Sequence, residues 1–541
     1  MPGIPSRLVQ PWQRLLVAAL ALQLFGFPRP AAADVLDMPI GVTAAGSPIH
    51  AAIDERALAP DRRVASILLV AGLDGTVDSV DLAAALLRDP GELGLALSAV
   101  LNAFPDRDPV ASFPPAGPAY GGHAVEAQYL WRFVGMLAPD LVIDLRADEA
   151  PSALEEALDR GAEPADVGRI PAATLRLRGG GLGLQRLRSE ALRRIGDLAA
   201  SLNPSQARQE LQSRLEREPV ETARVLEEAY GHALESAVYI PALALVGRLR
   251  LGDLEGESRL EDIERIVRPY LEGKPSLGPR PTGSHVSGHL VFAELHERTG
   301  NPSYLDLARA AADLGFEPDG SLKESMPFHN EMSDSVFMGC AILARVGRLT
   351  GEDRYFRMAL KHLRFMKGLD LRPDGLYRHS PLDHAPWGRG NGFPALGLAL
   401  SLSDWPDDDP GRGEVLDSLR DHLRALARRQ DPTGAWHQVV DRPESYREFT
   451  STAMIGFALH RGLRRGWLDR GEFEPVADRA WRAVQMRIKS DATFVDVCRS
   501  TGRQTSLRAY FQREAILGRD DRGGAMALLV ATERAYWQRE R

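Results

Sequence analysis

The sequence predicts a multidomain fold, in which an N-terminal α/β domain with a mostly parallel sheet precedes a C-terminal all-α domain. Between residues 34 and 150, short apolar, β-branched runs alternate with amphipathic helical segments, a pattern typical of parallel sheets. From residue 225 to residue 541, apolar residues recur at helical spacing throughout. The chain has 541 residues, of which 44% are hydrophobic, enough for separate cores in two or three domains.

Residues 1–33 are expected to form a secretory signal peptide. Arg7 and Arg14 give a basic start, and residues 15–27 form an apolar run that is too short to span a bilayer comfortably. Ala31–Ala33 then supply a cleavage site of small residues. We therefore expect an exported protein, periplasmic or secreted, without stable membrane insertion after cleavage. A retained membrane anchor is the alternative.

Charge and cysteine content narrow the class of protein further. A net charge of -8 and the lack of a long basic tract argue against a nucleic-acid partner. Cys340 and Cys498 are the only cysteines, so the fold does not rely on a framework of disulfides. Both lie in apolar or helical contexts, and we expect free, buried thiols.

The α/β part contains clear candidate elements. Residues 64–70, 95–101 and 141–143 have the apolar, β-branched character of strands, and residues 125–137 have the pattern of an amphipathic helix. Residues 151–224 are rich in Leu, Arg and Glu. We predict that they form a helical connector between the two domains.

The helical part contains an internal repeat. The turn Thr299–Tyr304 recurs as Thr350–Tyr355, each time between apolar helical segments. Helix hairpins that repeat at about fifty residues predict a closed or stacked helical array. Residues 225–541 have room for about twelve helices of ordinary length with short connections. This number fits an (α/α)6 barrel, in which turns at one end form a substrate rim.

The segment Trp387–Phe393 is the most informative in the chain, because it places a Trp, an Arg and an Asn among three glycines. Glycines let the backbone turn and come close to a ligand. Trp387 offers an aromatic face to a sugar ring, and Arg389 offers a planar fork to a carboxylate. Asn391 either bonds a substrate hydroxyl or orients the loop. This chemistry predicts a pocket for an acidic oligosaccharide.

Several segments of the helical part resemble, in the right order, those of glycoside hydrolase family 105, the unsaturated rhamnogalacturonyl hydrolases, and of the related family 88, the unsaturated glucuronyl hydrolases. Trp387–Phe393 resembles the signature W-x-R-G-N-G-W, with Phe393 in place of the second Trp. The other matching segments are Asp334–Met338, Gly375–His379, Thr450–Met454, Arg508–Phe511, and Asp520–Gly524 with Glu533. The resemblance implies an enzyme that removes a Δ4,5-unsaturated uronyl residue, left by a polysaccharide lyase, by hydrating its vinyl ether. It implies no cofactor and no metal.

The same resemblance implies that Asp334 is the catalytic acid. Asp334 precedes the apolar residues 336–343, so burial is expected to raise the pKa of its carboxyl toward that of a useful proton donor. The residues alone favour another interpretation, in which Asp334 is a helix N-cap.

Substrate-binding residues also follow from the resemblance. His379 matches a residue that lines the uronate subsite, Arg389 is expected to bind the substrate carboxylate, and Trp387 is expected to stack on the sugar. The family usually carries a second Asp in the segment that corresponds to residues 282–289, where this chain has none. Ser284 or His285 occupies its approximate position, and His285 is expected to line a subsite or to pack within a helix.

The domain of residues 34–150 resembles the zinc carboxypeptidase and succinylglutamate desuccinylase fold. Asp74, Val77 and Arg146 stand where that family has its His, Glu and His zinc ligands. A catalytic zinc needs about three protein ligands, whereas a valine cannot bind zinc and an arginine repels it. We therefore expect a degenerate, metal-free domain, in which Asp74 and Arg146 form an ion pair.

Two other functions are compatible with these residues. A polysaccharide lyase on the same barrel could use Tyr377 or His379 as its base, with Asn391 and Arg389 neutralising the substrate carboxylate. A non-catalytic carbohydrate-binding protein is the other alternative, because one family Asp is absent.

Overall fold

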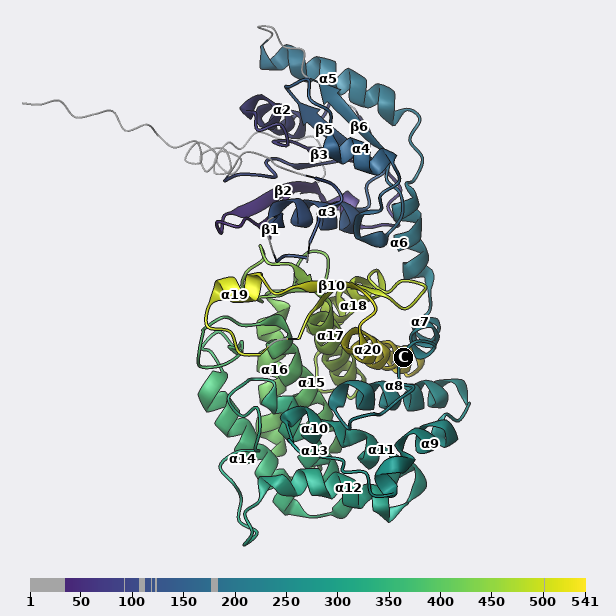
Figure 1. The fold of residues 1–541 in the computed structure, drawn as a ribbon, viewed down its shortest axis with the longest axis vertical. Helices are drawn as coiled ribbons and strands as arrows, with labels where there is room; N and C mark the ends of the chain where they lie inside the picture. Colours follow the sequence, from purple (N-terminus) through teal and green to yellow (C-terminus); the bar gives the residue numbers. More distant parts are fainter. Residues whose placement is uncertain are drawn as a thin grey trace, which may run out of the picture.

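The computed structural model describes residues 35–91, 93–106, 112–117, 119–121, 124–176, 183–500 and 502–541, which form two domains stacked end to end (Figure 1). The predicted signal peptide, residues 1–33, lies outside these ranges. In the part of the chain that is described, no helix combines the length and the apolarity needed to cross a bilayer.

A mixed β-sheet forms the centre of the N-terminal domain, with the strand order β1-β2-β4-β3-β5-β6. Strands β4, β3, β5 and β6 run parallel, whereas β1 and β2 form an antiparallel hairpin that joins the sheet beside β4. The sheet is therefore mostly parallel with an antiparallel edge. Its strands are β1 (Val35–Val42), β2 (Pro48–Asp54), β3 (Ser66–Val70), β4 (Ala96–Val100), β5 (Leu141–Arg146) and β6 (Ala172–Arg176).

Helices cover both faces of this sheet. They are α2 (Val77–Arg88) and α5 (Leu184–Ala199) on one face, and α3 (Val125–Leu137), α4 (Ala153–Asp159) and α6 (Gln206–Glu216) on the other. Successive side chains of a strand point to opposite faces, so Ile67 and Leu69 join the first core while Leu68 and Val70 join the second. A strand that is buried on both faces reads as a continuous apolar run, as residues 64–70 do.

The predicted connector is helical only in part. The predicted strands contain β3, β4 and β5, and the predicted helix 125–137 is α3. Within residues 151–224, however, β6 pairs in parallel with β5, and α5 packs against α2. The sheet domain therefore continues past residue 150. The short run that forms β6 gains its strand structure from pairing with β5, a distant contact that a local pattern does not reveal.

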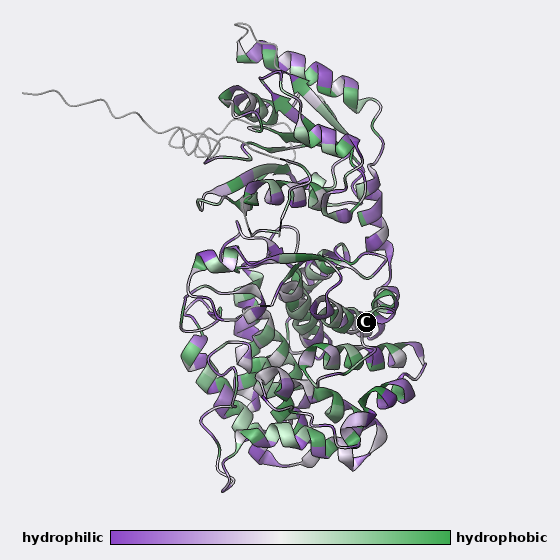
Figure 2. Cartoon of the chain, in the orientation of Figure 1, coloured by the Kyte–Doolittle hydropathy of each residue, from purple (hydrophilic) through white to green (hydrophobic). Residues whose placement is uncertain are grey.

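The C-terminal domain is a closed ring of helix hairpins. Each inner helix packs against the next, and the last, α20, returns to contact α8. The inner helices are α8 (Tyr239–Glu255), α10 (Gly283–Gly288) with α11 (Leu290–Thr299), α13 (Ser335–Thr350), α15 (Gly388–Asp404), α17 (Phe449–Arg464) and α20 (Asp521–Arg539). Outside them pack α7 (Pro219–Glu227), α9 (Leu260–Leu271), α12 (Pro302–Ala312), α14 (Asp353–Asp370), α16 (Arg412–Ala427) and α18 (Arg470–Gln485). Apolar residues follow the inner helices and the strands (Figure 2).

The expectation of an all-α C-terminal domain is incomplete. β7 (Trp436–His437) pairs with β8 (Arg447–Glu448), and β9 (Phe494–Cys498) pairs with β10 (Ala515–Gly518), with the short helix α19 (Leu507–Phe511) between β9 and β10. β7 and β8 have two residues each, too few to show a periodicity, and β9 and β10 gain their strand structure from pairing with each other. Figure 1 shows β10 and α19 at the junction with the α/β domain.

The two domains share one apolar core. Side chains from the sheet and from α3 cluster with Trp387, Tyr446, Val495 and Tyr510 of the C-terminal domain. Across this junction Tyr120 stacks on Tyr446, with 4.5 Å between the ring centroids. The α/β domain therefore covers the end of the helical ring at which the Trp387 segment lies.

The predicted ion pair between Asp74 and Arg146 is wrong. The Asp74 carboxylate accepts a hydrogen bond from the backbone N–H of Ala147 at 2.5 Å. Arg146 instead pairs with Asp144 at 3.3 Å and with Asp148 at 2.7 Å. The hydroxyls of Thr76 and Ser79 also donate to the Asp74 carboxylate, at 2.8 and 2.9 Å, so both groups have partners only a few residues away in the chain.

Cys340 and Cys498 are buried, and within the described chain both are free thiols, as predicted. In the same residue ranges, no group of three or more His, Cys, Asp or Glu side chains is arranged to hold a metal ion.

Glu533 ties α8, α17 and α20 together. Its buried carboxylate accepts hydrogen bonds from Arg250 of α8 at 2.5 Å, and from Arg461 and Arg464 of α17 at 2.7 Å each. Removing one member of a buried ion network leaves the other charges uncompensated, which costs about 3–5 kcal/mol.

We expect Glu533→Gln to lower the free energy of unfolding by about 3–5 kcal/mol, because three arginines lose their counter-charge. Urea unfolding followed by tryptophan fluorescence measures this change. Glu540→Gln is the matched control, because Glu540 also pairs with Arg464, at 2.8 Å, but is 48% exposed. Its loss should cost at most about 1 kcal/mol. Equal losses in the two variants would contradict the assignment of Glu533 as the central ion of this network.

Candidate active site

The candidate site lies where the inner helices α13, α15 and α17 begin. Asp334 directly precedes α13, Trp387 directly precedes α15, and Glu448 directly precedes α17. His379 lies in the segment between α14 and α15. The ring places the first turns of these helices together, so motifs that are far apart in the sequence meet at one end of the domain.

The Asp334 carboxyl is buried. The residue is 7% exposed, and burial raises the pKa of its carboxyl to about 7, although the nearby Arg389 favours the charged form. This confirms the predicted direction of the shift. Asp334 stands at the N-cap position of α13, but its side chain accepts no capping hydrogen bond from the described residues. The N-cap interpretation is therefore not supported.

His379 faces Asp334. Nε2 of His379 lies 3.6 Å from Oδ1 of Asp334, and Nδ1 lies 2.9 Å from the hydroxyl of Tyr510. Burial, with cations such as Arg389 nearby, lowers the pKa of His379 to about 3, so the ring is neutral. Among the described groups, neither Oδ1 of Asp334 nor Nε2 of His379 has a hydrogen-bond partner. A substrate hydroxyl or a water bound between them would satisfy both atoms.

Arg389 is held by the start of α17 and by β9. Its Nε donates to the Thr450 hydroxyl at 2.9 Å, and one Nη donates to the backbone carbonyl of Cys498. The same Nη lies 3.8 Å from the Glu448 carboxylate. These contacts leave Nη1 as the part of the fork that a substrate carboxylate would meet. The predicted role of Arg389 in binding that carboxylate stays a prediction.

Trp387 forms a wall between His379 and Arg389. The centroids of the Trp387 and His379 rings lie 4.4 Å apart, and the Arg389 guanidinium lies 5.3 Å from the centroid of the Trp387 ring. The indole N–H donates to Gln438 at 3.3 Å. Trp387 is only 1% exposed, so it positions its neighbours in this conformation, and its stacking on a sugar stays a prediction.

Asn391 lies in the first turns of α15 and holds the segment that precedes this helix. Its Nδ2 donates to the backbone carbonyls of Tyr377 and Trp387, at 2.8 and 2.9 Å, and its Oδ1 accepts from the Tyr377 N–H at 2.8 Å. Its amide oxygen and nitrogen are thus engaged with the backbone. The loop-orienting alternative accounts for Asn391, and contact with a substrate hydroxyl stays a prediction.

His285 belongs to α10 and is partly exposed. Its Nδ1 lies 2.8 Å from the Thr282 hydroxyl, and its Nε2 lies 3.2 Å from the Ser236 hydroxyl. A neighbouring ring, His329, is close enough that His285 lowers its pKa, although burial is the larger cause. The role of His285 in lining a subsite stays a prediction.

The sequence reasoning missed Asp370 and Arg503. Asp370 is buried, its pKa is raised to about 7 by burial, and its charge raises the pKa of Asp334. Arg503 pairs with Glu331 at 3.4 Å and helps to lower the pKa of His379. One signal could have found Asp370: it is an acidic residue at the end of an amphipathic helix, just before the turn that leads to His379.

Comparison with known families identifies the class of protein to which this helical domain belongs. A model described as Glycosyl Hydrolase Family 88 matches residues 255–537, more than half of the chain. The chain therefore belongs to glycosyl hydrolase family 88. This match covers the helical ring from α9 onward. The likeness of residues 34–150 to zinc carboxypeptidases stays a prediction.

Two curated relatives match part of the chain. The unsaturated rhamnogalacturonyl hydrolase YesR of Bacillus subtilis is 30% identical over 225 residues, which cover 38% of this chain and 64% of that protein. The unsaturated 3S-rhamnoglycuronyl hydrolase of Formosa agariphila is 35% identical over 100 residues, which cover 18% of this chain and 26% of that protein. The matches thus span less than two thirds of the length of either relative.

Among solved structures, a polysaccharide lyase superposes with a TM-score of 0.51 and 17% sequence identity. The superposition covers 59% of this chain and 98% of that one. At this identity the likeness concerns the fold alone.

The raised pKa of Asp334 predicts a protonated carboxylic acid at pH 6, where an ordinary Asp is ionised. We expect the infrared difference spectrum of the wild type minus Asp334→Asn to show the C=O stretch of one carboxylic acid at pH 6. The band should vanish as the pH rises through about 7. Asp421→Asn, which changes an exposed residue of α16, should show no such band. A spectrum without the acid band for Asp334 would mean that its carboxyl is not desolvated.

Proposed function

We propose that the chain is an exported glycoside hydrolase that removes a Δ4,5-unsaturated uronyl residue from lyase-generated oligosaccharides of the rhamnogalacturonan type. The observation that carries the proposal is the buried pair of Asp334 Oδ1 and His379 Nε2, which lie 3.6 Å apart. Within the described structure both atoms lack hydrogen-bond partners. The substrate class is supported by the names of the two relatives described above, an unsaturated rhamnogalacturonyl hydrolase and an unsaturated 3S-rhamnoglycuronyl hydrolase.

Asp334 acts first as an acid and then as a base in this proposal. Its proton passes to C4 of the unsaturated sugar as the C4–C5 double bond opens and positive charge develops at C5. A water oxygen then bonds to C5, and a proton from that water returns to the Asp334 carboxylate. The hemiketal at C5 collapses to a ketone, which opens the ring. The hemiacetal left at C1 then releases the neighbouring sugar as an alcohol.

The neutral His379 positions the reacting groups. Tyr510 holds Nδ1 of the ring at 2.9 Å, so Nε2 is aimed at Asp334 and at the space beside it. A water that bonds to Nε2 would be held next to the carboxyl that exchanges its proton. Holding the water and the carboxyl in this geometry lowers the activation free energy, because the entropy of bringing the two groups together is lost on binding and not in the reaction step.

Cations around the pocket suit an acidic sugar. Arg389, Arg503 and Arg513 all lower the pKa of His379, so their charges act on the pocket. Nη1 of Arg389 is the proposed contact for the substrate carboxylate, and Arg503, with its side chain 46% exposed, is a second contact at the edge. A uronate gains an attraction from these charges that a neutral sugar lacks.

The proposal includes the expected architecture and location. The closed ring of inner and outer helices supports an (α/α)6 barrel. The basic and apolar pattern of residues 1–33 supports export.

The lyase alternative has less support from the geometry. Tyr377 is 1% exposed, and its backbone N–H and carbonyl both bond to the Asn391 amide. A catalytic base must come within hydrogen-bond reach of the proton that it removes, and a carboxylate neutraliser must reach the substrate. In this conformation, Asn391 bonds to the backbone of Tyr377 and holds the segment before α15 in place.

The absorbance of the conjugated uronate tests the proposal directly. Incubation of the protein with lyase-digested rhamnogalacturonan should lower this absorbance as the double bond is hydrated. A rise in absorbance would favour the lyase alternative, and an unchanged absorbance would favour a protein that only binds carbohydrate.

We expect Asp334→Asn to lower the turnover number by about two to four orders of magnitude, because an amide cannot supply the proton for C4. Affinity for an unsaturated disaccharide, measured by calorimetry, should remain near that of the wild type, because the proposed carboxylate contacts are unchanged. Asp421→Asn, on the outer surface of the ring, is the control and should retain full turnover. Near-normal turnover of Asp334→Asn would exclude Asp334 as the acid.

A further inference from the structure

A cavity of about 60 Å³ lies between the two domains, away from Asp334 and His379. The α/β domain contributes Tyr120, Tyr129 and Arg132 to its wall, and the C-terminal domain contributes Tyr446, Arg447, Arg487 and Asp496, among other residues. It thus lies within the junction that the shared apolar core forms.

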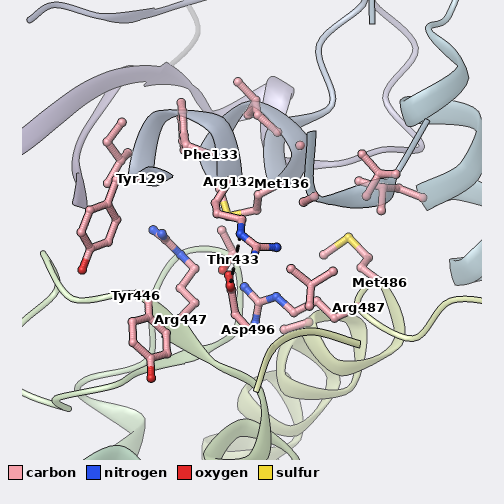
Figure 3. A pocket seen from close by; sticks show the side chains of 18 of the residues that line it. Tyr129, Arg132, Phe133, Met136, Thr433, Tyr446, Arg447, Met486, Arg487 and Asp496 are labelled. Atoms are coloured by element: carbon pink, nitrogen blue, oxygen red, sulfur yellow. Dashed lines mark ion pairs between the residues drawn. The ribbon is translucent and has the colours of Figure 1, made fainter. Parts of the chain in front are cut away.

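The charged lining of this cavity is unbalanced. Figure 3 shows the guanidinium groups of Arg132 and Arg487 beside Asp496, whereas that of Arg447 lies in the same cavity but is turned toward Tyr129. Arg447 pairs with Asp431 at 2.6 Å, and Arg132 lies 3.7 Å from Asp496. No carboxylate of the described residues lies within ion-pair distance of Arg487. Burial lowers the pKa of Arg487, and the charge of Asp496, which lies farther away, only partly opposes this shift. Among these described groups, three cations therefore face two carboxylates.

The arginines also have unused donors. Arg447 is 6% exposed and Arg487 is 8% exposed, so both are removed from bulk water. Nε of Arg447, and an Nη of each of Arg132 and Arg487, lack a hydrogen-bond partner in the described structure. An isolated buried charge is costly, and its cost falls when a counter-ion bonds to it. Burial lowers the pKa of Arg487, as expected for a cation without a close counter-charge.

We propose that this cavity is a binding site for a small oxyanion of the sulfate or phosphate type. The guanidinium fork matches the geometry of such oxygens, and three arginines from different elements line this one cavity. The volume has room for roughly four waters, which is close to the size of a five-atom oxyanion. A free ion and the charged group of an acidic sugar share this chemistry, and the experiment below distinguishes them.

An oxyanion at this place would link the two domains. Arg132 belongs to α3 of the α/β domain, Arg447 lies on β8, and Arg487 follows α18. An ion that binds all of them bonds both sides of the junction at once. A ligand that binds the folded state and not the unfolded state raises the apparent stability by mass action. Binding should therefore appear as a rise in Tm that saturates.

The experiment measures the Tm of the full chain against sodium sulfate, sodium phosphate and sodium galacturonate. Sodium chloride at matched ionic strength is the reference. Excluded salts such as sulfate stabilise proteins generally, without saturation and in every variant. A specific site adds a saturable rise with a defined midpoint. Calorimetric titration with sulfate measures the same dissociation constant directly.

Arg487→Met should raise the midpoint at least about tenfold, because it removes a charge-assisted hydrogen bond to the ion. Arg482→Met is the matched control. Arg482 lies on α18 just before Arg487, but its side chain is 44% exposed and pairs with Asp61. This variant should keep the midpoint of the wild type.

Asp496→Asn should strengthen binding of the ion, whereas Arg487→Met should weaken it. The Asp496→Asn variant therefore tests the site even if Arg487→Met does not fold. Removing the carboxylate that competes for the arginines should lower the midpoint and enlarge the rise in Tm. A saturable response to galacturonate alone would overturn the assignment of a sulfate- or phosphate-type ion, because the group bound would then be a sugar carboxylate. No saturable response to any of the three salts, or equal midpoints in all variants, would overturn the proposal and leave a cavity filled by solvent.

Discussion

The apolar core that the two domains share is the constraint on which the rest of the structure depends. Trp387 and Tyr510 belong to this core, together with side chains of the sheet and of α3. The same two residues hold His379, through a ring contact and a hydrogen bond, and His379 faces Asp334. The α/β domain thus packs against Trp387 and Tyr510, these two residues contact His379, and His379 faces Asp334 in the candidate site. This gives the domain a structural role that needs no catalytic or metal centre of its own.

The candidate site depends on a balance between desolvation and charge. Burial alone would raise the pKa of Asp334 further, whereas Arg389 favours its ionised form. Glu448 and Thr450 hold Arg389 at the start of α17, so the cation stays close without closing an ion pair on Asp334. A carboxyl with a pKa of about 7 can both give and take a proton near neutral pH. This is the property that a single carboxyl needs if it serves as acid and base in turn.

Local patterns were sufficient to predict α3, the strands β3, β4 and β5, and the helical nature of the second half, because burial imposes a strong periodicity on them. They were not sufficient for β6, which is a strand only because it pairs with β5. The direction of the Asp334 pKa shift was predictable, because an apolar helix follows that residue in the sequence. Arg503 was missed because the closure of the ring, rather than any spacing in the sequence, brings it to the site. Asp370 was missed although its position at the end of a helix, just before the turn that leads to His379, was a usable signal. The predicted Asp74–Arg146 pair does not form, because Asp74 bonds to Thr76 and Ser79 and Arg146 bonds to Asp144 and Asp148, all within five residues in the chain.

The central claim is that the chain acts on the double bond of an unsaturated uronyl residue rather than on its anomeric carbon. Proton NMR of an unsaturated disaccharide, followed during the reaction, tests this claim most directly. The account predicts that the vinyl proton at C4 disappears in step with release of the neighbouring sugar, one for one. Release of that sugar while the vinyl proton persists in the uronyl product would show direct displacement at the anomeric carbon, and would contradict the account.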